Sequence, residues 1–155
     1  MPPFSISHLS AKEIEVMRAL LKLFGDAFDE AETYCSAPPQ TDYLQRLLKQ
    51  EHCIALAALK QTEVVGGLVA YELQKFEQAR SEIYIYDLAV AIAHRRQGIA
   101  TALIQTLQEI ALERGAYVIF VQADLEDEPA ISLYTQLGDR EDVLHFDIPV
   151  QPSNG

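Results

Sequence analysis

The sequence predicts a mixed α/β (α+β) fold, in which a mostly antiparallel sheet with one parallel, right-handed β-α-β crossover is flanked by helices. Segments with an apolar residue at every second position alternate with segments in which apolar residues recur every three or four positions. Near the middle of the chain, two apolar runs are separated by only three residues, 61–63, as in a hairpin. A long amphipathic helix pattern then stands between two strand patterns, which requires a crossover.

The N-terminal third of the chain contains one strand pattern and two helix patterns. Residues 4–8 (FSISH) alternate apolar and polar side chains, as a strand does. Ser10 and Glu13 form a capping box ahead of an amphipathic helix. Residues 31–40 (AETYCSAPPQ) are expected to break this helix, and a short second helix is expected to begin near Thr41.

Strand patterns dominate the rest of the chain, with two helices between them. A long helix is expected from Ile99 to a C-cap at Gly115, and a short one from Pro129 to Gly138. The segment that follows the long helix reads as a buried strand, and the tyrosines of residues 81–90 read as core. The expected strands are 53–60, 64–73, 81–90, 116–123 and 143–148.

Length and composition narrow the class of protein. The 155 residues suit a single domain, with residues 1–3 and 149–155 as flexible ends. A net charge of −11 argues against a nucleic-acid binder and favours a cationic partner, although it also serves solubility alone. No secretory signal or membrane-length apolar run is present, so we expect a cytoplasmic protein that binds no membrane. The cysteines and histidines lack metal-ligand spacing, and no metal is expected.

The turn before the long helix has the features of an anion site. Gly98 permits a backbone path that a side chain would block, and the N–H groups around it lie at the positive end of a helix. Arg95 and Arg96 add donors that suit phosphate oxygens. Neither a P-loop nor a dinucleotide fingerprint is present. We predict that a diphosphate binds to Arg95, Arg96, Gln97, Gly98, Ile99, Ala100 and Thr101.

The same turn resembles a known family. Residues 95–100 match Arg-x-x-Gly-x-Ala, which is similar to the acyl-CoA pyrophosphate signature of the GNAT superfamily of N-acetyltransferases. Two more segments match in the same order: 87–90 (DLAV), where that superfamily splays its central strands, and 130–138 (AISLYTQLG), its Ala-x-x-Leu-Tyr-x-x-Leu-Gly helix. The resemblance implies the GNAT fold and acetyl-CoA as co-substrate. It also implies that the thioester and pantetheine arm bind the backbone of Leu88, Ala89 and Val90.

A closer resemblance, strongest over residues 75–124 and continuing to about residue 148, is to the small aminoglycoside 3-N-acetyltransferases that modify gentamicin-type antibiotics. It implies direct acetyl transfer, without an acyl-enzyme, to the 3-amino group of the deoxystreptamine ring, and hence antibiotic resistance. It also implies a possible homodimer. The residues themselves leave two alternatives open: an acetyltransferase for another polyamine or a protein amine, and a non-catalytic acyl-CoA-binding module.

Asp87 is the first candidate catalytic residue. By strand alternation it shares a face with Ile83 and Ile85, where a carboxylate is costly unless it is paired or used. We predict that it binds the substrate ammonium and, directly or through water, takes the amine proton. The alternative is a carboxylate that is hydrogen-bonded inside a sheet bulge.

The other candidates follow the crossover. The resemblance implies that Tyr134 protonates the thiolate of the leaving CoA; packing in the core is the alternative. Asp124 and Asp142 belong to acidic loops and are candidates for binding the positive charges of the substrate, although such loops are also commonly just solvated.

Overall fold

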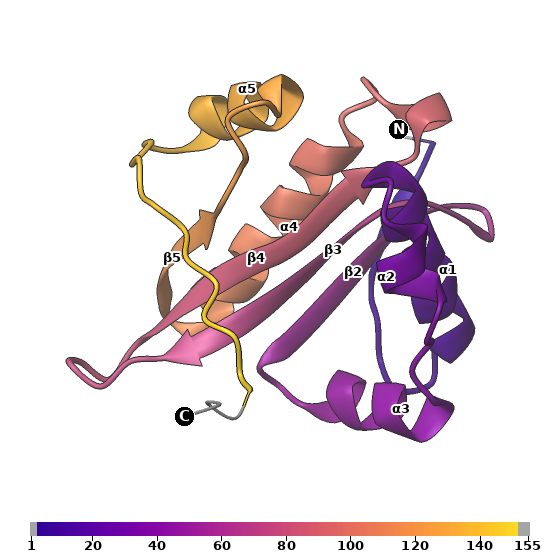
Figure 1. The fold of residues 1–155 in the computed structure, drawn as a ribbon, viewed down its shortest axis with the longest axis horizontal. Helices are drawn as coiled ribbons and strands as arrows, with labels where there is room; N and C mark the ends of the chain where they lie inside the picture. The colour runs from indigo at the N-terminus through magenta and orange to yellow at the C-terminus, as the bar shows by residue number, and fades with distance from the viewer. Residues whose placement is uncertain (1–2, 152–155) are drawn as a thin grey trace. The chain divides into compact units, whose positions relative to one another are not determined.

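The structure, a computed structural model, describes residues 3–151 and divides the chain into two units, Met1–Gln122 and Ala123–Gly155, which are described separately. Within residues 3–122, the first unit contains a five-stranded sheet, four α-helices and a short 3₁₀ helix, Ile92–His94 (Figure 1). Its strands are β1 Ser5–His8, β2 Cys53–Lys60, β3 Glu63–Gln74, β4 Ser81–Val90 and β5 Ala116–Val121. Its helices are α1 Ile14–Ala27, α2 Ala31–Cys35, α3 Thr41–Lys49 and α4 Ile99–Arg114.

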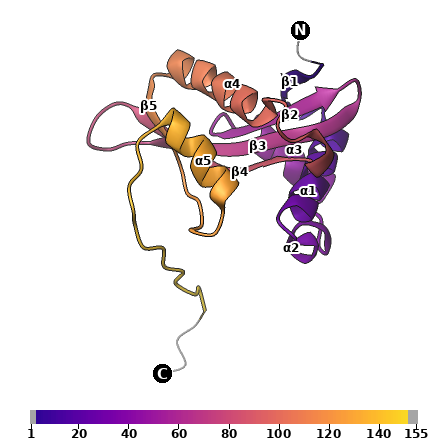
Figure 2. The same ribbon diagram turned by 90° about the horizontal axis from the view of Figure 1, so that it is seen from above.

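The sheet confirms the predicted fold class. Its strand order is β1-β2-β3-β4-β5, and every neighbouring pair is antiparallel except β4 and β5, which are parallel and joined through α4. Figure 2 shows α4 on one face of the sheet and α1 and α2 on the other. Two layers of side chains result, one under α4 and one under α1. No helix among residues 3–151 has the length and apolar character of a membrane span.

The layer under α1 depends on small residues in the sheet. Leu20 and Phe24 of α1 are fully buried against strand positions that include Ala55 and Ala57. At Gly67 of β3, an added Cβ atom would lie 2.1 Å from a methyl carbon of Leu20. The helix therefore rests directly on the strand backbone, which larger side chains would prevent.

β4 contains an extra residue relative to β3, a bulge next to Asp87 of the kind named in the alternative interpretation of that residue. Ala70 of β3 pairs with Ile85, and the next residue, Val69, pairs with Asp87, so Tyr86 forms a β-bulge. Paired residues share a face of the sheet, and Val69 packs against the layer under α1. Asp87 therefore lies on the α1 face.

The predicted placement of Asp87 on one face with Ile83 and Ile85 is consequently wrong, because the bulge at Tyr86 reverses the alternation. The prediction that Tyr86 belongs to the core is wrong for the same reason, since this side chain is 62% exposed. The predicted break at residues 31–40 is also only partly correct, because α2 occupies its first half.

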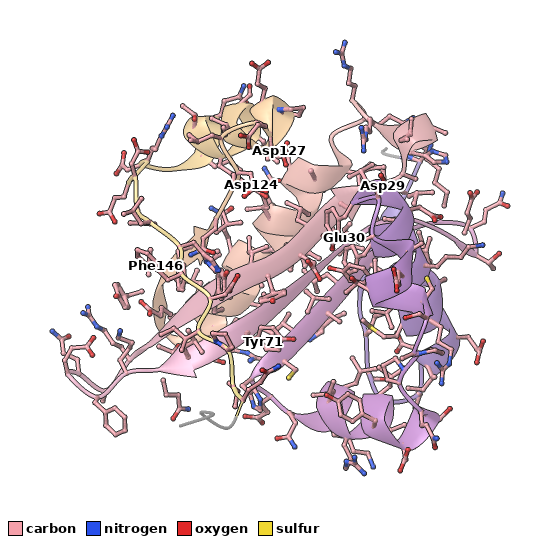
Figure 3. The ribbon with its side chains drawn as sticks, in the orientation of Figure 1. Asp29, Glu30, Tyr71, Asp124, Asp127 and Phe146 are labelled. Atoms are coloured by element: carbon pink, nitrogen blue, oxygen red, sulfur yellow. The ribbon has the colours of Figure 1, made fainter. Side chains whose placement is uncertain are left out.

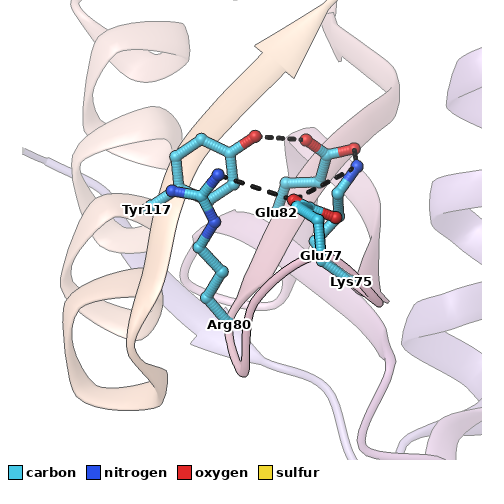
Figure 4. Close-up of polar contacts among 5 residues, drawn as sticks. All are labelled: Lys75, Glu77, Arg80, Glu82 and Tyr117. Atoms are coloured by element: carbon cyan, nitrogen blue, oxygen red, sulfur yellow. Dashed lines mark hydrogen bonds and ion pairs between the residues drawn. The ribbon is translucent and has the colours of Figure 1, made fainter.

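A group of polar side chains joins β5 to the turn between β3 and β4 (Figure 4). The Arg80 guanidinium lies 3.7 Å from the ring centroid of Tyr117, whose hydroxyl donates to Glu82 at 3.0 Å. The Lys75 Nζ atom forms an ion pair with the Glu82 carboxylate at 3.4 Å, and the Arg80 guanidinium forms one with the Glu77 carboxylate at 3.5 Å. The prediction that this strand is buried is wrong, because none of the residues of β5 is buried and Tyr117 is 49% exposed. A polar network lies at the start of the strand instead of an apolar layer.

Among its described residues, 123–151, the second unit contains one helix, α5 Glu128–Leu137. The Asp127 carboxylate caps the first turn of this helix and accepts from the Ala130 N–H at 3.2 Å. The predicted strand at 143–148 is wrong: these residues form no strand pairing within the part of the chain that the structure describes. Their apolar side chains are exposed, and their alternation alone cannot make a strand without a partner ladder. Of the predicted flexible ends, residues 1–2 and 152–155 lie outside the described residues.

Candidate active site

One edge of β4 is open where the resemblance places the thioester. The parallel pairing of β4 with β5 ends at Ile85 and Val121, whereas the pairing of β4 with β3 continues to Val90. Leu88, Ala89 and Val90 therefore have β3 on one side and no paired strand on the other among residues 3–151. Backbone groups on that open edge are available to a ligand.

The turn that leads into α4 leaves backbone donors free. Gly98 is the N-cap of the helix, with φ +81°. The first intrahelical bond runs from the Ala102 N–H to the Gly98 carbonyl at 3.0 Å. The N–H groups of Ile99, Ala100 and Thr101 precede that bond and have no acceptor within the helix. An anion at this position would meet both these donors and the positive end of the helix dipole.

The backbone conformation explains the glycine at this turn, as predicted. A Cβ atom added at Gly98 would meet nothing within 4 Å, so no part of the protein blocks a side chain. The constraint is the left-handed backbone conformation, which favours glycine. Arg96, two residues earlier, also has a positive φ of 62°.

Cationic side chains surround the same turn. Arg95 and Arg96 are exposed, and the Arg95 Nε atom donates to the Val90 carbonyl at 3.3 Å, which links the turn to the end of β4. Lys60 of β2 adds a cation that the sequence analysis did not find: its Nζ atom lies 2.8 Å from the Gln97 side-chain oxygen. The residues present therefore suit the diphosphate of a coenzyme.

Asp87 has a hydrogen-bond partner from a distant part of the chain. The Tyr34 hydroxyl lies 3.0 and 3.1 Å from its two carboxylate oxygens. Burial raises the pKa of Asp87, and the hydrogen bond from Tyr34 partly offsets this increase. Burial and the nearby carboxylate also raise the pKa of Tyr34, which therefore stays protonated and donates.

Local packing fixes the position of Tyr34. The centroid of its ring lies 6.1 Å from the ring centroid of Phe24 and 6.0 Å from that of Phe28. Gly25 allows α2 to approach α1, because a Cβ atom there would lie 3.2 Å from the Cβ atom of Tyr34. No local motif predicts this contact, because Tyr34 and Asp87 are 53 positions apart in the sequence. The contact was not predicted from the sequence.

A second carboxylate lies near Asp87. The negative charge of Glu30, which precedes α2, raises the pKa of both Asp87 and Tyr34. Figure 3 shows Glu30 beside the sheet and Tyr71, a residue of β3, further along the sheet. The Glu30 N–H donates to the Gly25 carbonyl at 2.8 Å, which holds the turn between α1 and α2. A second negative charge within electrostatic range of Asp87 suits a substrate with more than one positive charge.

A family model of the acetyltransferase (GNAT) family matches residues 17–139 of the chain. The chain is a member of the GNAT acetyltransferase family. Membership implies acetyl-CoA as the acyl donor, and the open edge of β4 and the cationic turn fit such a donor.

Solved structures of similar proteins cover almost the whole acetyltransferase. The aminoglycoside acetyltransferase HMB0005, from an uncultured soil metagenomic sample, is 62% identical, with a TM-score of 0.94 over 96% of this chain and 99% of its own. The aminoglycoside acetyltransferase meta-AAC0020, also from soil, in complex with sisomicin, is 31% identical, with a TM-score of 0.89 over 96% and 97% of the two chains.

A relative found by sequence comparison is matched over a smaller part of its own length. N-acetyltransferase 8B of Rattus norvegicus is 29% identical over 84 residues, which are 54% of this chain and 38% of that protein. The acetyltransferase therefore matches well under half the length of this relative.

The remaining candidate residues of the acetyltransferase belong to the second unit. Tyr134 lies on α5, and burial, together with the Asp127 carboxylate, raises its pKa to about 12. Asp124 is exposed. Asp142 is also exposed and accepts a hydrogen bond from the Arg140 Nε atom at 2.7 Å, so its charge is already paired within the loop.

Proposed function

We propose that this acetyltransferase transfers the acetyl group of acetyl-CoA to an amine of an aminoglycoside, the 3-amino group of the deoxystreptamine ring. The observation that carries the proposal is Asp87, a half-buried carboxylate that accepts a hydrogen bond from Tyr34 and lies directly before the open edge of β4. The similarity to HMB0005 and to the sisomicin complex of meta-AAC0020 supports the choice of acceptor.

The donor half of the site, which binds acetyl-CoA, is formed by backbone groups and by two arginine side chains. The diphosphate binds at the turn, where the N–H groups of Ile99 to Thr101 and the side chains of Arg95 and Arg96 supply donors. The open edge of β4 receives the pantetheine arm and the thioester carbonyl. Because these backbone donors are fixed before the reaction, they can stabilise the negative charge that develops on the carbonyl oxygen.

The acceptor half binds and deprotonates the amine. Asp87 holds the substrate ammonium and takes its proton, directly or through water, and Glu30 attracts a second cationic group. The free amine then attacks the thioester carbon, so that a carbon–nitrogen bond forms and the carbon–sulfur bond breaks. The nitrogen, which is positively charged after the attack, releases its second proton to water and becomes the neutral amide. The sulfur leaves as a thiolate, and no acyl-enzyme is formed.

Tyr134 is the proposed donor of a proton to that thiolate. Its pKa of about 12 keeps the phenol protonated at neutral pH. The same value makes transfer to a thiolate unfavourable, since an ordinary thiol has a pKa of about 8.5. A donor of this kind works only if the thiolate is held close and the product amide prevents the reverse reaction.

The proposal is tested by incubating the protein with acetyl-CoA and gentamicin, measuring thiol release, and locating the acetyl group by NMR. We expect one acetyl group on the 3-amino nitrogen. Asp87→Asn should lower kcat/KM for gentamicin by about 10²- to 10⁴-fold, because it removes the charge and the base. Asp42→Asn, an exposed carboxylate on α3, is the matched control and should leave kcat/KM unchanged.

Other acceptors are the alternative outcome of the same assay. Thiol release with spermidine or a peptide amine, and none with gentamicin, would overturn the aminoglycoside assignment. Binding of acetyl-CoA without turnover of any amine would indicate a non-catalytic acyl-CoA-binding module instead. Acetylation at another nitrogen of gentamicin would remove only the 3-amino assignment.

A further inference from the structure

An apolar cavity of about 160 Å³ lies between α1, α3 and the sheet, and Asp87 forms part of its wall. α1 contributes Phe24, α3 contributes Leu44 and Leu47, and β2 contributes Ala55. Among the described residues that line the cavity, Asp87 is the one that carries a charge at neutral pH. The cavity thus combines an apolar interior with a single carboxylate.

The surroundings of two polar groups in its wall agree with an apolar interior. Burial raises the pKa of the Cys53 thiol and is also the main cause of the raised pKa of Tyr71. A cavity of about 150 Å³ lined by aliphatic and aromatic side chains holds one benzene molecule in another protein. The present cavity therefore has the size of a single six-membered apolar ring.

An aminoglycoside ring does not suit this interior. Its carbon atoms carry hydroxyl and amino groups, and burying these groups without hydrogen-bond partners is costly. An amine with one apolar substituent satisfies both parts of the cavity, because its ammonium group pairs with the carboxylate and its ring fills the apolar space.

We propose that this cavity is a binding site for the apolar group of a small primary amine whose ammonium group lies on Asp87, so that arylmethylamines and cycloalkylmethylamines bind here. The proposal rests on the ammonium-binding role of Asp87 in the proposed function. It adds a ligand class that differs from the polyhydroxylated acceptor and that competes with that acceptor for the same carboxylate.

Cys53 provides a direct readout, because it lines the cavity and is one of the two cysteines in the sequence. In a Cys35→Ser protein, iodoacetamide can alkylate only Cys53. Benzylamine at about four times its Kd should slow this alkylation about fivefold, since a bound ring covers the thiol. Methylamine, which lacks the ring, and benzyl alcohol, which lacks the charge, should slow it less than about twofold at the same concentration. Methylamine also controls for the reaction of amines with the reagent.

A pair of variants tests the location. Leu47→Phe places extra volume in the cavity and should weaken benzylamine binding about tenfold or more by titration calorimetry. Leu112→Phe makes the same exchange at a position on α4 that is 84% exposed, and should leave the Kd unchanged. Asp87→Asn should bring the affinity for benzylamine down to that for benzyl alcohol.

The outcomes separate this proposal from the proposed function. If benzylamine leaves the alkylation of Cys53 unchanged while gentamicin is acetylated, the cavity proposal is wrong and the enzyme assignment stands. If benzylamine protects Cys53 and gentamicin is not acetylated, the aminoglycoside assignment fails alone. Should Leu47→Phe not fold, the protection experiment in the Cys35→Ser protein still decides, because it leaves the cavity intact.

Discussion

Replacing Tyr34 with phenylalanine removes one hydroxyl group and leaves the aromatic packing with Phe24 and Phe28 in place. The hydroxyl is within 3.1 Å of both Asp87 oxygens, but its single proton counts as one hydrogen bond. A hydrogen bond to a charged acceptor contributes about 1.5–3 kcal/mol. Because Asp87 is only half-buried and water can replace part of the contact, we expect the free energy of unfolding to fall by about 1–2 kcal/mol at neutral pH.

The same substitution should change the pH dependence of the reaction. The hydrogen bond from Tyr34 lowers the pKa of Asp87, so its loss raises that pKa. Asp87 then becomes protonated at a higher pH, and the base is lost earlier as the solution is acidified. The acidic limb of kcat/KM for gentamicin should therefore move to higher pH. The loss of stability should be largest where Asp87 is ionised and should shrink as the pH falls through its pKa.

Two measurements check this prediction. Thermal unfolding at neutral pH should show a Tm lower by about 2–8 °C for a chain of this length. The pH profile of kcat/KM should shift in Tyr34→Phe and stay in place in Tyr86→Phe, which removes the same atom from an exposed neighbour. Coinciding acidic limbs for Tyr34→Phe and the wild type would refute the inference that Tyr34 tunes Asp87, whatever the change in Tm.

Further substitutions address the other parts of the molecule. Gly98→Val should raise the KM for acetyl-CoA about tenfold or more with circular dichroism unchanged, because a β-branched residue disfavours φ +81°; an unchanged KM would place the anion site elsewhere. Tyr134→Phe should lower kcat about 10²-fold, and a loss below about threefold would exclude it as the proton donor. Gly67→Ala should lower the free energy of unfolding by about 1–3 kcal/mol in denaturant titrations, since its Cβ would meet Leu20. The same exchange at Gly138, where a Cβ meets nothing within 4 Å, should change it by less than about 0.5 kcal/mol.

The features of the fold that could be predicted are those that local periodicity determines. The crossover helix is one example: its apolar spacing predicts the helix, and Gly115 ends it with a positive φ of 73°. The hairpin between β2 and β3 is another, since two apolar runs with a short polar link have few alternatives. The turn at Gly98 was also predicted from local sequence, and its glycine has the positive φ of 81° that a side chain disfavours.

The features that could not be predicted depend on pairing between distant segments. The bulge at Tyr86 exists only relative to β3, so the alternation within β4 alone gave the wrong face for Asp87. The contact between Tyr34 and Asp87 needs α2 to form and to lie against α1, and its residues carry no motif. The segment 143–148 shows the opposite error, because a strand-like pattern cannot indicate whether a partner strand is present.

The bulge in β4 also separates two structural roles within one strand. Before it, Ile83 and Ile85 fill the layer under α4, and after it, Asp87 faces α1 and the cavity. A mutation at Asp87 or in the cavity wall should therefore leave two features unchanged: the packing of α4 on the sheet, and the turn at Gly98 from which α4 starts. The residues that determine which amine is accepted are therefore separate from those that hold the coenzyme, so the acceptor preference can change without a change in how acetyl-CoA binds.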